Sequence, residues 1–253
     1  MERHLDSKER FTDYVEDYVR YRPSYPAALL DQLLLVCGLA AGSVAADIGA
    51  GTGKFTRLLL ERGLTVYAVE PNNAMRAAAR EALSSFGGFR SVAAPAERTT
   101  LPDTSADVVT AAQAFHWFDR NAFRDECRRI LRPGGRVALV WNRRDGSAPV
   151  MRDYEEIIQA HHDDRPNRTM RDMGPDSYGP FFAGGYETHT VLSDQWMDCE
   201  GLVGRALSSS YAPRPGHPQH EPLQAALRAL FDRYQEDGKI RFQYRSELIA
   251  GEV

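Results

Sequence analysis

The stretch "DIGAGTGKFTRLL", residues 47–59, places three glycines at alternate positions directly after a short apolar run. Alternating glycines let a backbone pass close to a ligand or to another segment, because no side chain intervenes. Three ligands suit such a turn: a dinucleotide pyrophosphate, the phosphates of a nucleoside triphosphate, or a smaller cofactor without phosphate. The spacing is not that of a P-loop, which needs four residues between the first glycine and Gly-Lys-Ser/Thr. A tight turn without any ligand is the structural alternative.

Two acidic residues narrow the choice of ligand. Glu70 ends the next predicted strand, 21 residues after Gly49, where a carboxylate can accept hydrogen bonds from both hydroxyls of a ribose. Asp47 lies just before the turn, where its negative charge would repel a pyrophosphate and attract an ammonium group. S-adenosylmethionine carries an adenosine and an amino-acid tail but no phosphate, so it fits this pair of acids.

The chain around this stretch alternates between predicted strands and helices. We expect strands at 43–49, 65–70, 89–94, 106–113 and 136–142, and helices at 27–39, 54–63, 72–86 and 121–135. This alternation is typical of a parallel sheet with helices on both faces. The predicted fold class is therefore α/β: a Rossmann-like, doubly wound, mostly parallel sheet with an antiparallel last strand and helical cover elements.

After Asn142 the regular alternation ends. The patterns predict helices at 150–162, 198–211 and 223–235, a Gly/Pro/Asp-rich loop or lid at 163–185, and strands at 186–192 and 240–253. No linker separates two units, so we expect one domain over 1–253. Within it we expect an N-terminal helical cover at 1–40, a cofactor-binding core at 41–145, and a lid or insertion with the closing strands at 146–253.

Composition sets limits on partners and location. The 43% hydrophobic and 26% charged residues are ordinary for a soluble globular protein, and no apolar run has the length of a membrane span. The charged N-terminus is unlike a secretory signal, so a cytoplasmic location without a membrane partner is predicted.

A net charge of −4 disfavours nucleic acid as a partner. The three cysteines lie far apart and adjacent histidines at 161–162 point in different directions, so no metal is expected. Oligomeric state is not visible in the sequence.

Four segments, in this order and spacing, resemble the class I S-adenosylmethionine-dependent methyltransferases: "VAADIGAGTGKFT" (44–56), "VYAVEPNNAM" (66–75), "APAERTTLPDTSADVVTAAQAFHWFD" (94–119) and "RILRPGGRVALVWN" (129–142). More narrowly, they are similar to the small-molecule branch with the ubiquinone/menaquinone-type and trans-aconitate-type enzymes. The similarity extends from Phe11 to Asn142 and, more weakly, through "RALSSSYAP" (205–213).

The resemblance implies a set of residues that bind the cofactor S-adenosylmethionine. Those matching positions around its methionine part are Asp47, Gly49, Gly51, Gly53 and Gln113. The residue matching the ribose acid is Glu70, and those matching positions around the adenine are Pro71, Met75, Ala96 and Glu97. Helix packing of Met75 and a solvated charge at Glu97 are the simpler alternatives.

The residues after the fourth strand, "QAFHWFD", should face the reacting methyl group, because ligands of such sheets bind beyond the carboxyl ends of the strands. His116 is the residue of this segment that can act as a base near neutral pH, and packing is its structural alternative. Trp117 and Trp141 are candidates for a substrate wall or for the core. Tyr21 and Arg22 belong to the N-terminal element that covers the cofactor in the resembled family, which makes them substrate-binding candidates.

The predicted function is therefore methyl transfer from S-adenosylmethionine to a small organic molecule by in-line displacement. Alternatives on the same fold are an RNA or protein methyltransferase, or a non-methylating protein that binds S-adenosylmethionine. Mild acidity, and the lack of an N-P-P-Y-like sequence after the fourth strand, disfavour methylation of a nucleobase.

Overall fold

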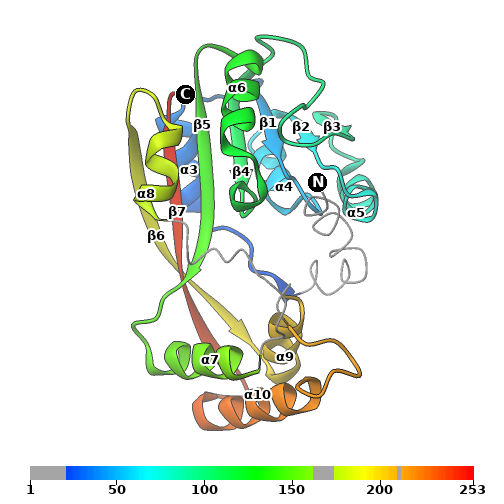
Figure 1. The fold of residues 1–253 in the computed structure, drawn as a ribbon, viewed down its shortest axis with the longest axis vertical. Helices are drawn as coiled ribbons and strands as arrows, with labels where there is room; N and C mark the ends of the chain where they lie inside the picture. Colours follow the sequence, from blue (N-terminus) through cyan, green and yellow to red (C-terminus); the bar gives the residue numbers. More distant parts are fainter. Residues whose placement is uncertain (1–20, 162–173, 210–211) are drawn as a thin grey trace.

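The computed structural model describes residues 21–161, 174–209 and 212–253. Residues 1–20 of the expected N-terminal cover, and residues 163–173 of the expected lid, therefore lie outside the described residues. The described part contains one seven-stranded sheet in the order β3-β2-β1-β4-β5-β7-β6 (Figure 1).

The predicted fold class is confirmed by the strand directions. Within the described residues, five neighbouring strands are parallel: β1 (Val44–Ile48), β2 (Thr65–Val69), β3 (Phe89–Val92), β4 (Ala106–Ala112) and β5 (Leu131–Arg144). The last strand, β7 (Ile240–Gly251), is antiparallel to β5 and to the edge strand β6 (Tyr186–Met197). Because β4 ends beside β1, the loops that follow these two strands meet at one edge of the sheet.

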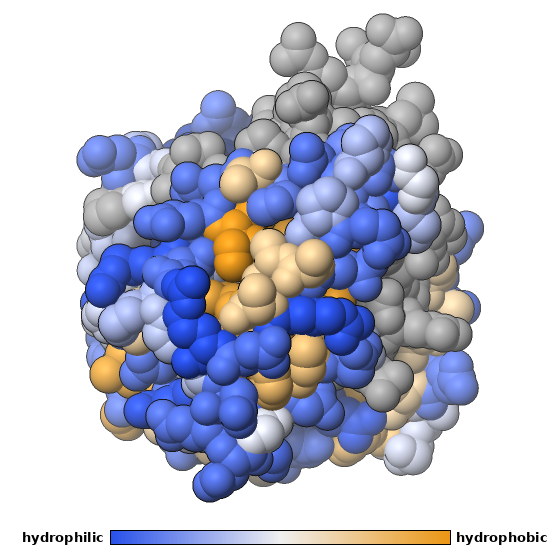
Figure 2. Space-filling model, turned by 90° about the horizontal axis from the view of Figure 1, so that it is seen from below, coloured by the Kyte–Doolittle hydropathy of each residue, from blue (hydrophilic) through white to orange (hydrophobic). Residues whose placement is uncertain are grey.

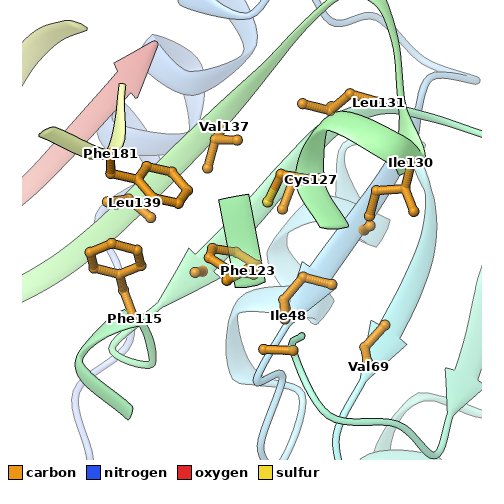
Figure 3. Packing of buried hydrophobic residues seen from close by; sticks show 14 of the residues in the cluster. Ile48, Val69, Phe115, Phe123, Cys127, Ile130, Leu131, Val137, Leu139 and Phe181 are labelled. Carbon is orange, nitrogen blue, oxygen red and sulfur yellow. The ribbon is translucent and has the colours of Figure 1, made fainter. Parts of the chain in front are cut away.

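Helices cover both faces of the sheet, since adjacent strand residues such as Ala45 and Ala46 are both buried, each in a different core. One core packs the strands against α3 (Ala27–Val36), α4 (Lys54–Glu61) and the end of α5 (Asn73–Leu83). The other packs them against α6 (Arg120–Ile130) and against the short helices η2 (Phe115–Trp117), α8 (Pro175–Tyr178) and η4 (Gly179–Phe181). Figure 3 shows side chains of this second core.

Strands β5 and β6 are longer than predicted, and together with β7 they extend past strands β1 to β4 (Figure 1). Their far ends carry α7 (Pro149–Ala160), α9 (Cys199–Leu207) and α10 (His220–Tyr234), which we call the cap. The cap has its own core, in which Tyr154, Leu202 and Leu227 pack with Phe242 of β7. Seen from this end, mainly hydrophilic residues surround a small hydrophobic area (Figure 2). The prediction of one domain over 1–253 stays a prediction.

Two further predictions differ from the structure. The helix expected over 121–135 ends at Ile130, because Pro133 cannot continue it and the residue before a proline avoids the helical region. Part of the expected lid is core instead: Phe181 and Tyr178 are 3% and 5% exposed. The ring of Phe181 lies 4.9 Å from that of Phe115 and stacks on Phe123 (Figure 3). The apolar residues at the end of the Gly/Pro-rich stretch pack into the core, and this packing determines the position of residues 174–182.

This packing predicts a large stability difference between two substitutions. Phe181→Ala should lower the free energy of unfolding by about 3–5 kcal/mol, because it leaves a cavity in the core. Leu192→Ala, on an edge-strand side chain that is 70% exposed, is the control and should change it by less than about 0.5 kcal/mol. Urea unfolding followed by circular dichroism measures both. Equal, small effects would mean that residues 174–182 do not form part of the core.

Candidate functional site

The three glycines of the turn between β1 and α4 have two different roles, close packing and an open surface. All three have a positive φ, +70° at Gly49, +58° at Gly51 and +80° at Gly53, which side chains rarely adopt. A Cβ at Gly49 would lie 2.6 Å from Cβ of Ala114, and one at Gly53 would lie 2.5 Å from Cδ1 of Leu83. Among the residues that the structure describes, a Cβ at Gly51 would meet nothing within 4 Å. Two glycines therefore allow close packing, and Gly51 leaves one side of the turn open.

Glu70, directly after β2, lies beside this open side. Its Oε2 accepts a hydrogen bond from N–H of Gly51 at 2.9 Å, and its Oε1 accepts one from N–H of Asn72 at 2.8 Å. Burial raises the pKa of Glu70 above its ordinary value. Each carboxylate oxygen still has a lone pair for a further donor. The hydroxyl of Thr52, the residue after Gly51, is buried and has no hydrogen-bond partner within the described chain. Both groups suit a ligand with hydroxyl and polar groups over Gly51.

Asp47 lies beneath the turn. It is 1% exposed, and its two carboxylate oxygens accept hydrogen bonds from the hydroxyls of Thr56 (2.6 Å) and Thr110 (2.8 Å). Burial raises the pKa of Asp47 to about 6, although both threonine hydrogen bonds act in the opposite direction. The sequence placed this carboxylate near a ligand's ammonium group. In the structure its direct partners are the threonines of α4 and β4.

Gln113 directly follows β4 and adopts a left-handed conformation with φ +58°. Its backbone N–H donates to O of Val140 at 2.9 Å, and its side-chain Nε2 donates to O of Asn142 at 3.2 Å. A non-glycine residue in this region costs free energy, and such strain is concentrated at functional sites. The conformation turns the chain away from the sheet at the edge where the glycine turn lies.

The residues matched to the adenine follow strands β2 and β3, which end at the same edge of the sheet. Pro71 is half-buried after Glu70, and Met75 is 4% exposed in the first turn of α5. Ala96 is buried, and the carboxylate of Glu97 accepts a hydrogen bond from N–H of Asp119 at 2.9 Å. Glu97 therefore links the loop after β3 to the start of α6.

The residues after β4 lie partly in the core and partly at the surface. Phe115 is fully buried, whereas His116 and Trp117 are half-buried, with ring centroids 5.0 Å apart. This half-exposure keeps His116 available as a candidate base.

Trp141 requires a correction. It is fully buried in the core, its ring stacked on Tyr178 at 5.9 Å and edge-on to Phe115 at 6.3 Å, so it does not form a substrate wall. The physical reason is the alternation of β5, which turns Trp141 towards the α6 core and the next residue, Asn142, to the other face. Asn142 there donates from Nδ2 to O of Ser24 (3.0 Å) and accepts from Oγ of Ser246 (2.6 Å).

The segment before α3 connects the glycine turn to the cap. The ring of Tyr21 packs so closely on Gly204 of α9 that any Cβ there would overlap it. Nη2 of Arg22 donates to O of Ser208 at the end of α9 (3.0 Å), and Nζ of Lys54 donates to O of Arg22 (2.6 Å). Lys54 is not among the predicted site residues, although its position directly after the third glycine departs from the glycine pattern of a dinucleotide loop.

The structure also contains no metal-type cluster of three His, Cys, Asp or Glu side chains within the residues it describes. None of the helices formed by those residues combines the length and hydrophobicity that a membrane span requires.

Comparisons with known proteins identify the family of this chain. A methyltransferase-domain model matches residues 46–139. An uncharacterised methyltransferase of Mycobacterium tuberculosis is 44% identical over 206 residues, which cover 81% of this chain and 79% of the relative. The chain belongs to the class I S-adenosylmethionine-dependent methyltransferases. A solved structure from Anaeromyxobacter dehalogenans, provisionally described as a type II methyltransferase, is similar with TM-score 0.70 and 27% identity, covering 92% of this chain and 98% of the other.

A methyltransferase of Geobacter sulfurreducens solved with S-adenosylhomocysteine shares the fold at TM-score 0.51 and 18% identity, covering 92% of this chain and 93% of the other. The family model spans β1 to most of β5 and so includes the glycine turn, Glu70, Gln113 and η2. The cap of this methyltransferase lies outside that match.

The buried carboxyl of Asp47 predicts a pH-dependent stability. With a native pKa of about 6 against about 4 in the unfolded chain, the native state alone holds a proton between these values. The buried carboxyl therefore destabilises the native state least below pH about 4, where it is protonated in both states. As the pH rises from about 4 to about 6, it should lower the free energy of unfolding by up to about 3 kcal/mol.

Asp47→Asn should remove this fall, because an amide does not titrate. Urea unfolding of both proteins between pH 4 and 7 measures the difference between the two curves, in which groups shared by both cancel. Parallel curves would show that Asp47 keeps its ordinary pKa in the native protein.

Proposed function

We propose that this methyltransferase binds S-adenosylmethionine over the open side of Gly51 and methylates a small organic molecule by in-line displacement. The observation that carries the proposal is the pairing of an empty Cβ position at Gly51 with the Glu70 carboxylate hydrogen-bonded to the same backbone. A fold neighbour, the Geobacter sulfurreducens methyltransferase, has been solved with S-adenosylhomocysteine, which supports this choice of cofactor.

The residues present fit such a cofactor. Glu70 retains acceptor capacity for the two ribose hydroxyls, and the buried Thr52 hydroxyl has no other hydrogen-bond partner in the described chain. Pro71 and Met75 supply apolar surface on the adenine side. Asp47 supports the turn from below and contributes negative charge under an amino group. When bound, the cofactor supplies an electrophilic methyl group on a sulfonium.

The chain then has to align the acceptor, exclude water and, where necessary, remove a proton. The residues after β4 suit these tasks because they follow a strand that ends beside the glycine turn. His116 would take the acceptor's proton at one of its ring nitrogens. Trp117 and the N-terminal segment at Tyr21 and Arg22 would contact the acceptor and cover the site. An acceptor without a proton to lose would need only the alignment.

The cofactor proposal predicts the effect of two substitutions on S-adenosylhomocysteine binding. Glu70→Ala should weaken binding by about 100-fold or more, because two hydrogen bonds to a charged group are lost. Gly51→Val should weaken it at least as much, because the side chain would occupy the open side of the turn. Isothermal titration calorimetry measures both affinities.

Matched controls separate binding from charge and strain. Glu61→Ala removes an exposed carboxylate of α4, and Gly134→Val adds a side chain at another open, positive-φ glycine (φ +78°). Both should bind like the wild type. A folded Glu70→Ala protein with unchanged affinity would refute the cofactor assignment, as would binding of NAD without any binding of S-adenosylhomocysteine.

The role of His116 is tested on an acceptor found by incubating the enzyme with labelled S-adenosylmethionine and a metabolite panel. If His116 removes a proton, His116→Ala should lower turnover by about 100-fold or more and leave cofactor affinity near the wild-type value. The loss should shrink as the pH approaches the acceptor's own pKa. His189→Ala, on the edge strand β6, is the control. Near-normal turnover of folded His116→Ala would exclude His116 as the base.

A further inference from the structure

A glycine in the interior of α9 makes room for an aromatic ring. Gly204 is the sixth of the nine residues of this helix, where glycine is less favourable than alanine. A Cβ at Gly204 would overlap the ring of Tyr21. The helix has a second glycine, Gly201, whose Cβ would meet Asp198 and Met197, just before the helix, and not Tyr21. The ring of Tyr21 therefore occupies the space of the side chain that Gly204 lacks.

Two hydrogen bonds hold the same part of the chain on the cap side. Nε2 of Gln195, on β6, donates to O of Tyr21 at 3.3 Å. Nη2 of Arg22 donates to O of Ser208, directly after α9, at 3.0 Å. We call residues 21–24 the strap. Its start is attached to α9 and β6, which lie outside the part of the chain that the family model matches.

The rest of the strap is attached to the core at two points beside the candidate site. Nζ of Lys54, directly after the glycine turn, donates to O of Arg22 at 2.6 Å. Nδ2 of Asn142 donates to O of Ser24 at 3.0 Å, and O of Asn142 accepts from Nε2 of Gln113 at 3.2 Å. One attachment is therefore next to the loop after β1, and the other is next to the loop after β4. The strap connects the cap to the edge of the sheet where these two loops meet.

We propose that Gly204 is a positioning residue for the cofactor site: by receiving the ring of Tyr21, it holds the strap across the two loops and slows release of the cofactor. This rests on the proposed function, because that function places the cofactor at the sheet edge where the strap is attached. Gly204 acts through Tyr21. Since protein interiors are close-packed, a methyl group at Gly204 and the ring cannot share one space, and the strap must leave its position.

The test measures the association and dissociation rates of S-adenosylhomocysteine on the immobilised full-length chain by surface plasmon resonance. Gly204→Ala should raise the dissociation rate by about tenfold and change the association rate little. Tyr21→Ala removes the same contact from the other side and should have the same effect. The double variant should be no weaker than either single variant within about threefold, because both substitutions remove one contact. Tyr21→Phe keeps the ring and should bind within about threefold of the wild type.

Gly201→Ala is the matched control, because it adds the same methyl group to the same helix away from Tyr21, and it should bind like the wild type. Circular dichroism without ligand shows which variants are folded. Folded Gly204→Ala with the wild-type dissociation rate would overturn the proposal, as would losses that multiply in the double variant.

If Gly204→Ala does not fold, Tyr21→Ala decides alone, and an unchanged dissociation rate in that variant overturns the proposal. Tyr21→Phe as weak as Tyr21→Ala would assign the effect to the hydroxyl and would also overturn it. Wild-type protein that does not bind S-adenosylhomocysteine would instead refute the proposed function, so the two failures are distinguishable.

Discussion

The carboxylate of Asp47 joins three elements beneath the glycine turn. Asp47 belongs to β1, and its two carboxylate oxygens accept hydrogen bonds from Thr56 of α4 and Thr110 of β4, one on each oxygen. A buried carboxylate is unfavourable unless such donors surround it, and breaking one of them would leave a charge unsatisfied. The position of the first turn of α4 relative to β4 is therefore fixed. The open side of Gly51, and the carboxylate of Glu70 beside it, depend on that arrangement.

The second constraint is the junction between this core and the cap. The long antiparallel pairing of β5, β7 and β6 places the cap helices away from the parallel strands. Residues 21–24 contact both the core and the cap. Asn142 holds Ser24 from the core, and Arg22 donates to the end of α9. Hydrogen bonds join the two parts at this junction, whereas the apolar contacts lie in separate cores on either side of it.

The sequence predicted those features that depend on neighbours along the chain. Apolar runs followed by helical patterns predicted the five strands of the parallel half and the helices between them. The distance from Gly49 to Glu70 predicted an acid beside the turn, as the 2.9 Å hydrogen bond to Gly51 shows. The junction could not be predicted in the same way. Contacts such as Arg22 with Ser208 or Asn142 with Ser246 join residues more than 100 positions apart, and no local pattern encodes that pairing. For the same reason Trp141 was ambiguous, because the face of β5 to which it turns follows from sheet registry.

The central claim is that the open side of Gly51 and the carboxylate of Glu70 form one nucleoside site. The most direct measurement is a crystal structure of the protein with S-adenosylhomocysteine. The account predicts both ribose hydroxyls within hydrogen-bond distance of the Glu70 carboxylate, with the ligand in contact with the backbone at Gly51. A ligand bound elsewhere, with Glu70 still contacting only Gly51 and Asn72, would contradict it.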